Sequence, residues 1–306
     1  MKASLLTILL GLLTLSVSAQ SFTEKITKEF SFDKKGPQNA LMVFNINGNV
    51  KVEGYSGDKI LVEVERTITG KTTERLERGK QEIQLGVSHQ ADTIMLYVNS
   101  PCNEFGKNVK NDRKGSRSWY SNRNRNGWGY LWSDRRDDDD CGSSKYNYKM
   151  DFVIKVPMSV NVMASTINHG DLDLSNINAA ITADNINGSI RLKNISGTTH
   201  ASTINGSVDV DYSGNPSGDS KYYSLNGDIN ANFKKGLAAQ LTFKSFNGDF
   251  YSSVNEITPM AVTVEKYQKG EGIAYKVNGN RYKVRQGGPL LDFETFNGDV
   301  YLREVN

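Results

Sequence analysis

Apolar and polar residues alternate with a period of two on both sides of a recurring Asn-Gly pair. The shared pattern reads polar, apolar, Asn, Gly, then Asp, Ser or Asn, then apolar and polar again. Such alternation is typical of strands, and both Asn and Gly tolerate a positive φ. Each copy therefore predicts a strand, a tight corner and a second strand. The corners fall at Asn47-Gly48, Asn187-Gly188, Asn205-Gly206, Asn226-Gly227, Asn247-Gly248 and Asn297-Gly298.

The spacing of the copies indicates how the strands stack. Asn168 lies in a copy stretched by one residue, and the next corner Asn residues follow at steps of 19, 18, 21 and 21. This spacing, with weaker half-repeats midway, favours an all-β, two-sided parallel β-solenoid whose equivalent Asn side chains form a ladder. An antiparallel meander with Asn-Gly hairpins stays open as the alternative, because the half-repeats also fit a turn about every 8–12 residues.

Regions outside the regular array predict a few other elements. Residues 72–85 favour a short helix despite Gly79, and residues 94–98 and 148–156 alternate like strands. A hairpin about Asn278-Gly279, within an insertion at about 267–288, interrupts the array, and the last repeat is expected to close the stack.

The first nineteen residues have the three parts of a signal peptide. A basic start at Lys2 precedes an apolar run over residues 5–15, and Val17-Ser18-Ala19 offers a cleavage site. We expect an exported chain in the periplasm or on the outer cell surface, made of one domain over residues 20–306. No later run is long and apolar enough to predict a transmembrane anchor.

The composition argues against nucleic-acid binding and against a metal site. The chain carries 37 Lys and Arg against 34 Asp and Glu, a net charge of +3 that gives no general reason to bind nucleic acid. Two Cys and three His leave little material for a metal site. We therefore expect no metal and no cofactor.

The segment at 103–140 breaks the repeat and contains all three Trp residues of the chain. It is expected to be an irregular loop, with Cys102 and Cys141 at its neck as a candidate disulfide in an exported chain. Because Trp, Tyr and Arg dominate binding hot spots, the loop is a candidate contact surface. The alternative is a solvated insert whose aromatic residues pack on the domain edge. The candidate binding residues are Trp119, Tyr120, Trp128, Tyr130 and Trp132.

No catalytic motif stands out in the sequence. Asp228, Asp249 and Asp299 follow Asn-Gly in three aligned copies, and stacking would place them in an acidic ladder. Such a ladder could supply paired carboxylates for catalysis. The simpler interpretation is that each Asp accepts a hydrogen bond from backbone at its corner.

The recurring Ser/Thr, apolar, Asn, Gly, Asp, apolar motif, which ends at Asp299-Val300, resembles the bacterial putative-adhesin family of repetitive β-proteins. Its members are frequent in Bacteroidetes-type genomes and are mostly of unknown function. The resemblance covers residues 43–306 apart from 102–141 and 267–288. It implies a right-handed β-helix-like fold, an envelope location and no known catalytic residues.

Three functions remain open from the sequence. The first is a non-catalytic, adhesin-like module that binds an envelope glycan or protein through its extended face and its loop. The second is a carbohydrate-active enzyme on a β-helix, with an Asp228 and Asp249 pair as the place to look. The third is a purely structural envelope protein.

Overall fold

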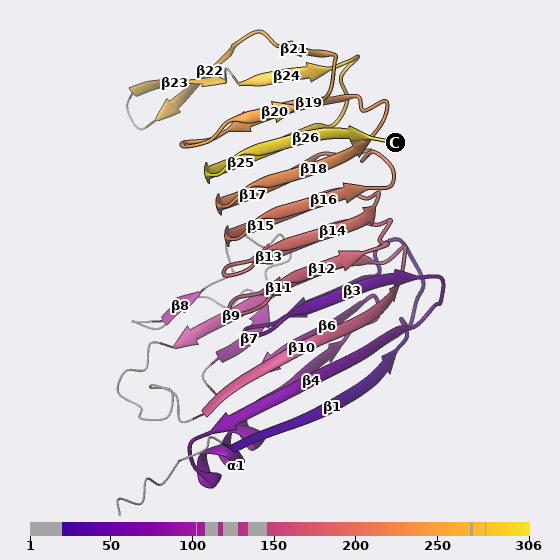
Figure 1. The fold of residues 1–306 in the computed structure, drawn as a ribbon, viewed down its shortest axis with the longest axis vertical. Helices are drawn as coiled ribbons and strands as arrows, with labels where there is room; N and C mark the ends of the chain where they lie inside the picture. The colour runs from indigo at the N-terminus through magenta and orange to yellow at the C-terminus, as the bar shows by residue number, and fades with distance from the viewer. Residues whose placement is uncertain are drawn as a thin grey trace, which may run out of the picture.

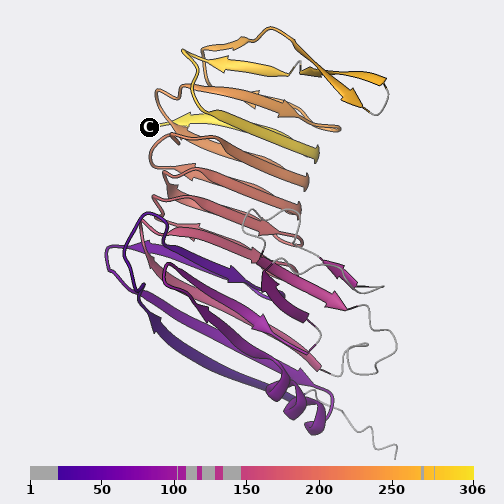
Figure 2. The ribbon, with the colours of Figure 1, turned by 180° about the vertical axis from the view of Figure 1, so that it is seen from behind.

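Two large β-sheets face each other along most of the molecule (Figures 1 and 2). The computed structural model describes residues 20–101, 103–107, 116–118, 128–133, 146–269, 272–278 and 280–306. The signal peptide predicted at 1–19 lies outside these residues. The described chain is nearly all β, with one α-helix, which confirms the expected all-β class.

The first sheet has ten strands. Its three outermost strands at one end pair in antiparallel fashion, and all later neighbours are parallel. In spatial order they are β1 (Gln20–Phe30), β4 (Ile60–Gly70), β10 (Tyr146–Pro157), β3 (Val50–Tyr55), β12 (Leu172–Ser175), β14 (Ile190–Ile195), β16 (Val208–Tyr212), β18 (Ile229–Lys234), β26 (Val300–Val305) and β20 (Phe250–Ser252).

The second sheet has eleven strands, with antiparallel pairs at its two ends and parallel pairs between. In spatial order they are β21 (Ile257–Pro259), β24 (Arg281–Val284), β19 (Ala239–Lys244), β25 (Leu290–Asn297), β17 (Ser220–Asn226), β15 (Thr199–Asn205), β13 (Ile181–Asn185), β11 (Asn161–Thr166), β2 (Ala40–Phe44), β6 (Thr93–Asn99) and β5 (Gln84–His89).

From β11 to β20 the chain alternates between the two sheets. Each Asn-Gly corner therefore joins a strand of the second sheet to a strand of the first, as between β15 and β16. We call such a strand, corner and strand a layer. Equivalent strands of adjacent layers pair in parallel, so these corners are not the hairpins that an antiparallel meander requires.

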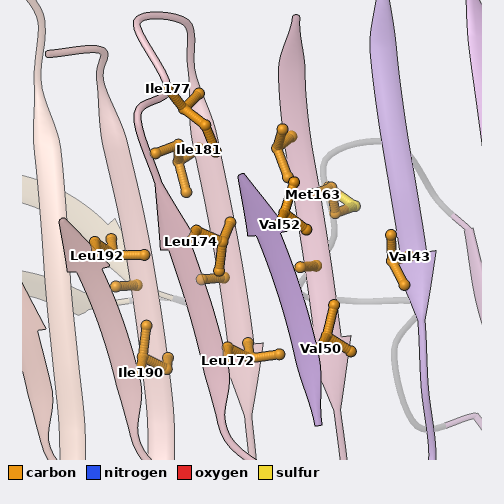
Figure 3. Packing of buried hydrophobic residues seen from close by; sticks show 14 of the residues in the cluster. Val43, Val50, Val52, Met163, Leu172, Leu174, Ile177, Ile181, Ile190 and Leu192 are labelled. Atoms are coloured by element: carbon orange, nitrogen blue, oxygen red, sulfur yellow. The ribbon is translucent and has the colours of Figure 1, made fainter. Parts of the chain in front are cut away.

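The core fills the space between the sheets. Alternate side chains point inward and stack in register, so that Leu172 lies beside Ile190, and Ile190 beside Val208. All three are fully buried, and Figure 3 shows the same arrangement for their neighbours. Burying one such side chain stabilises the fold by about 1.5–3 kcal/mol. The period-two pattern read from the sequence therefore accounts for the core.

The predicted helix is confirmed as α1 (Thr73–Glu82). The Thr72 hydroxyl accepts a hydrogen bond from the Arg75 amide and caps its first turn. A Cβ on Gly79 would lie 2.6 Å from Ile68 of β4, so glycine allows the helix to pack closely on the sheet. This explains a residue that otherwise weakens helices.

The order of the layers at the C-terminal end corrects one expectation. The last repeat does not close the stack, because β25 lies between β17 and β19, and β26 lies between β18 and β20. The outer layer β19–β20 thus comes earlier in the sequence than β25–β26, which lies beneath it in the stack. Parallel pairing on both sides of β25–β26 holds the inserted layer in place.

Two smaller sheets correct other expectations. Strand β23 (Gly272–Asn278) pairs with β22 (Thr263–Lys269), whereas β24 pairs with β19 and β21, so the expected hairpin about Asn278-Gly279 is wrong. The insertion at 103–140 is not wholly irregular either. It contains β7 (Asn103–Lys107), β8 (Ser116–Ser118) and β9 (Trp128–Ser133) in a small antiparallel sheet.

Candidate binding surface

The corner Asn side chains form a hydrogen-bonded ladder along one edge of the molecule, as the sequence predicted. Each side-chain amide Nδ2 donates to the Oδ1 of the equivalent Asn in the adjacent layer. The donor and acceptor pairs are Asn187 to Asn168 (3.1 Å), Asn205 to Asn187 (2.8 Å), Asn226 to Asn205 (3.0 Å), Asn297 to Asn226 (2.8 Å) and Asn247 to Asn297 (3.0 Å). The ladder fixes the register of the corners and ends at Asn247.

The Ser or Thr before a corner Asn and the Gly after it contact the backbone of the adjacent layer. The hydroxyls of buried Thr203 and Ser224 donate to the carbonyl oxygens of Gly188 and Gly206 in the adjacent layer, at 2.8 and 2.9 Å. A Cβ on Gly206 would overlap the Gly188 carbonyl oxygen. The Ser/Thr and Gly positions of the motif thus satisfy and accommodate closely stacked backbone.

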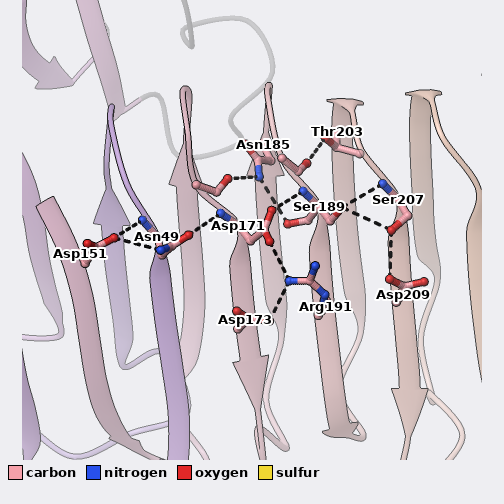
Figure 4. Close-up of polar contacts among 12 residues, drawn as sticks. Asn49, Asp151, Asp171, Asp173, Asn185, Ser189, Arg191, Thr203, Ser207 and Asp209 are labelled. Atoms are coloured by element: carbon pink, nitrogen blue, oxygen red, sulfur yellow. Dashed lines mark hydrogen bonds and ion pairs between the residues drawn. The ribbon is translucent and has the colours of Figure 1, made fainter. Parts of the chain in front are cut away.

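A second ladder follows the first on the side of the first sheet (Figure 4). The backbone N–H of Ser189 donates to Asp171, and that of Asp171 donates to Asn49, at 2.8 and 2.9 Å. Arg191 also pairs with Asp171 at 2.8 Å and with Asp173 at 3.5 Å. The corner carboxylate of Asp171 is therefore neutralised by a cation from the adjacent layer.

The three aspartates singled out in the sequence occupy this second ladder in a different order. Asp299 lies between Asp228 and Asp249, so the last two are not neighbours. The Asp299 N–H donates to the Asp228 carboxylate, and the Asp249 N–H donates to the Asp299 carboxylate, both at 2.9 Å. Two of the carboxylates thus accept backbone hydrogen bonds, and in each case the donor belongs to the adjacent layer and not to the turn that the sequence predicted the Asp to cap.

Among the Asn-Gly corners that the structure describes, an aromatic residue precedes the Asn in the last two layers, and an aliphatic residue does so in the others. Phe246 and Phe296 stack with ring centroids 4.8 Å apart and occupy the position that Ile186, Ile204 and Leu225 fill elsewhere. Phe246 is 73% exposed. Because aliphatic residues build the same corner in other layers, the fold does not require a ring here.

A second aromatic pair lies on the outer face of the first sheet. Tyr251 and Tyr301 stack at 5.1 Å, and the Tyr301 hydroxyl donates to Asp299 at 3.1 Å. The negative charge of Asp249 raises the pKa of Tyr251, and the hydrogen bond to Asp299 raises the pKa of Tyr301. Both phenols are therefore neutral donors at neutral pH, beside carboxylate acceptors.

Exposed apolar side chains gather at the same end of the molecule. Within the part of the chain that the structure describes, eight of the ten large exposed apolar residues belong to residues 246–305. They are Phe246, Tyr251, Val262, Val264, Ile273, Tyr275, Phe296 and Val305. We call these residues, together with the outer edge of β20, the terminal surface.

The insertion shows a different use of aromatic residues. Tyr130 is 2% exposed, and its hydroxyl accepts from the Val98 N–H and donates to the Phe44 carbonyl, both at 2.9 Å. Phe105 stacks on Tyr97 at 4.3 Å and on the half-buried Trp128 at 5.6 Å. These rings attach the insertion to the outer side of β2 and β6, in line with the packing alternative.

The structure describes only some of the remaining residues proposed from the sequence. Trp119, Tyr120, Cys102 and Cys141 lie outside the described residues, so the contact surface and the disulfide stay predictions. Trp132 belongs to β9. The structure brings Trp128 and Tyr130 together through Phe105, with ring centroids 5.6 and 5.3 Å from it.

The described residues contain no group of three or more His, Cys, Asp or Glu side chains placed to hold a metal ion. In the same residues, no helix has the length and apolar character needed to cross a bilayer.

Comparison with known proteins gives two similar solved structures. One is a putative cell adhesion protein from Clostridium sporogenes, with 10% identity, a TM-score of 0.41, and coverage of 93% of this chain and 100% of that one. The other is a putative adhesin from Bacteroides fragilis, with 10% identity, a TM-score of 0.25, and coverage of 92% and 97%. No family model and no curated protein matches the chain.

Proposed function

We propose that this chain is an exported, non-catalytic, adhesin-like binding module of the cell envelope, built as a right-handed parallel β-solenoid. The observation that carries the proposal is the terminal surface. There the chain replaces the Ile or Leu of its corners by exposed Phe246 and Phe296 and adds the stacked tyrosines. Exposed apolar residues gathered in this way are typical of binding sites.

The solenoid part of the proposal rests on connectivity. Successive strands alternate between two sheets, and equivalent strands pair in parallel at each step. Stacked repeats bury a continuous core and leave long faces and an end free for contacts. The right-handed sense of the coil comes from the family resemblance.

The non-catalytic part of the proposal rests on how the corner carboxylates are used. Asp228 and Asp299 each accept a backbone N–H from the adjacent layer, as structural ladder residues do. If the enzyme alternative were correct, Asp249→Asn would abolish turnover of an envelope polysaccharide. We expect Asp249→Asn to leave glycan binding intact. We also expect no polysaccharide turnover by either the parent chain or this variant.

The test is binding of the mature chain, starting at Gln20, to isolated envelope fractions and to a glycan array. The main variant carries Phe246→Leu, Phe296→Leu and Tyr251→Asn, which copy the residues the chain itself uses at Leu225 and Asn230. We expect it to lose at least tenfold in binding. Val153→Thr, an exposed apolar residue on β10, is the matched control and should bind normally.

A second variant, altered in the insertion, distinguishes binding by the terminal surface from binding by the insertion. Replacing residues 108–127 by Asn-Gly takes out Trp119 and Tyr120 and leaves a two-residue turn between the paired Lys107 and Trp128, so Phe105, Trp128 and Tyr130, which attach the insertion, are kept. Binding that survives this replacement and disappears in the terminal variant supports the proposal. Loss with the replacement alone would instead assign binding to the insertion, and binding by neither the parent chain nor any variant would favour a structural role.

A further inference from the structure

The β22–β23 hairpin is the part of the terminal surface that projects from the rest of the molecule. Both views place it beyond the Asn-Gly corners of the neighbouring layers (Figures 1 and 2). Its two strands pair only with each other among the described residues. An isolated two-stranded hairpin is marginally stable in water, so contact with another surface would stabilise this one.

One face of the hairpin combines exposed apolar side chains with a lysine. Val264 and Lys266 alternate along β22, and Ile273 and Tyr275 alternate along β23. The register places Lys266 opposite Tyr275, so all four residues share one face. The three apolar residues are 56–61% exposed, and Lys266 is exposed beside them. Water therefore covers a face on which apolar and cationic side chains are mixed.

The hairpin and the strand that follows it concentrate positive charge. Residues 263–284 carry five Lys or Arg residues and two Glu residues, and this excess of three equals the net charge of the whole chain. Basic residues beside exposed apolar side chains are typical of segments that bind an anionic lipid surface. The hairpin projects beyond the corners, so it meets a flat surface before the corner carboxylates do.

The size of this face favours a lipid surface over a protein partner. Two paired strands of seven residues form a face of roughly 20 by 10 Å. This is about a quarter of the roughly 800 Å² that each partner buries in a standard protein interface. A lipid surface requires neither that area nor a complementary shape, because apolar burial and charge attraction both contribute residue by residue.

We propose that the β22–β23 hairpin docks the chain on an anionic membrane surface. The apolar side chains enter the boundary between headgroups and acyl chains, and the Tyr275 ring keeps its hydroxyl in water. Lys266 extends its ammonium group to the lipid phosphates. This inference rests on the proposed envelope location and names a lipid surface as one partner of the terminal surface. The corner rings of Phe246 and Phe296 lie outside this contact.

The test is sedimentation of the mature chain, starting at Gln20, with vesicles of equal parts phosphatidylglycerol and phosphatidylcholine. Vesicles of phosphatidylcholine alone are the neutral reference. We expect the parent chain to bind the anionic vesicles at least about tenfold more tightly than the neutral ones. Added salt should remove most of that difference, because it screens the attraction between lysines and phosphates.

Two variants separate the apolar contribution from the charged one. Ile273→Thr with Tyr275→Thr keeps residues that favour strands and should weaken binding to the anionic vesicles at least about tenfold. Lys266→Gln should weaken that binding about fivefold and leave binding to neutral vesicles unchanged. Val153→Thr, an exposed apolar residue on β10, is the matched control and should bind as the parent chain does. Circular dichroism checks that each variant is folded.

The outcomes distinguish this inference from the proposed function. A parent chain that binds anionic vesicles no better than neutral ones overturns the inference. So does anionic-vesicle binding that both the folded hairpin variant and Lys266→Gln retain. If vesicle binding fails and the variant altered at Phe246, Phe296 and Tyr251 still loses glycan binding, the proposed function stands alone. Vesicle binding that responds as expected, with glycan binding unchanged in that variant, supports this inference and contradicts the ligand surface.

Discussion

The two ends of the molecule are finished in opposite ways. The N-terminal end is closed by β1 and α1, and Arg66 of β4 joins them by pairing with Glu24 at 2.7 Å and donating to backbone carbonyls of Lys80 and Ile83. The C-terminal end leaves the β20 edge and a cluster of apolar side chains exposed. Stacked repeats need a polar cap at each end to remain soluble as monomers. The C-terminal end is therefore the end at which we propose a contact with a partner.

Removing the central residue of the N-terminal cap should have the largest effect. The Arg66 side chain is 5% exposed, so Arg66→Met leaves two backbone carbonyls of the α1 region and the Glu24 carboxylate without their donor. We expect a loss of about 3 kcal/mol in the free energy of unfolding. Urea denaturation followed by circular dichroism measures it.

A control for Arg66→Met is available in the same cap. Lys25→Met removes an ion pair whose two side chains are both well exposed, and should cost less than about 1 kcal/mol. Equal losses in the two variants would contradict the view that Arg66 holds β1 and α1 together.

Substitution of a corner glycine by alanine should destabilise an interior layer more than the terminal layer. A Cβ at Gly206 would overlap the Gly188 carbonyl, and a Cβ at Gly248 would overlap the Gly298 carbonyl. The layer that contains Gly206 lies between two other layers. The layer that contains Gly248, β19–β20, has no further strand beyond β20 in the first sheet. We expect Gly206→Ala to cost about 3 kcal/mol and Gly248→Ala about half as much.

The same denaturation experiment measures both glycine variants, with Gly36→Ala as a control. A Cβ at Gly36 meets its nearest neighbours at an ordinary 3.6 Å. Similar losses at positions 206 and 248 would show that the terminal layer is as confined as an interior one. That result would remove the physical difference on which the comparison of the two ends depends.

The sequence predicted the layers but not their order. Asn-Gly spacing and period-two alternation were enough to predict strands, corners and the Asn ladder, because each layer repeats the same local requirements. The insertion of β25–β26 beneath β19–β20 was missed because Asn247 and Asn297 have the same flanking pattern. Either copy could stack on Asn226, and only long-range packing selects between them.

The candidate surface was harder to predict than the fold. The three Trp residues drew attention to the insertion, yet the Tyr130 and Phe105 rings within it serve packing. Phe246 and Phe296 were visible as aromatic substitutions in an aliphatic column. Their exposure could not be predicted, because it depends on which layer is last. Strand β1 was also missed, since charged residues on its outer face mask the alternation of Phe22 and Ile26.

The smallest effect on stability is expected where the effect on binding is largest. Phe246→Leu with Tyr251→Asn removes two exposed rings and leaves the corner ladders intact, so the monomer should lose only the stacking energy, about 0.5–1.5 kcal/mol per pair. Thermal unfolding checks this, with envelope binding measured on the same samples. A well-folded variant that no longer binds would show that the C-terminal end is built for contact, whereas a large loss of stability would mean that the rings are the missing cap.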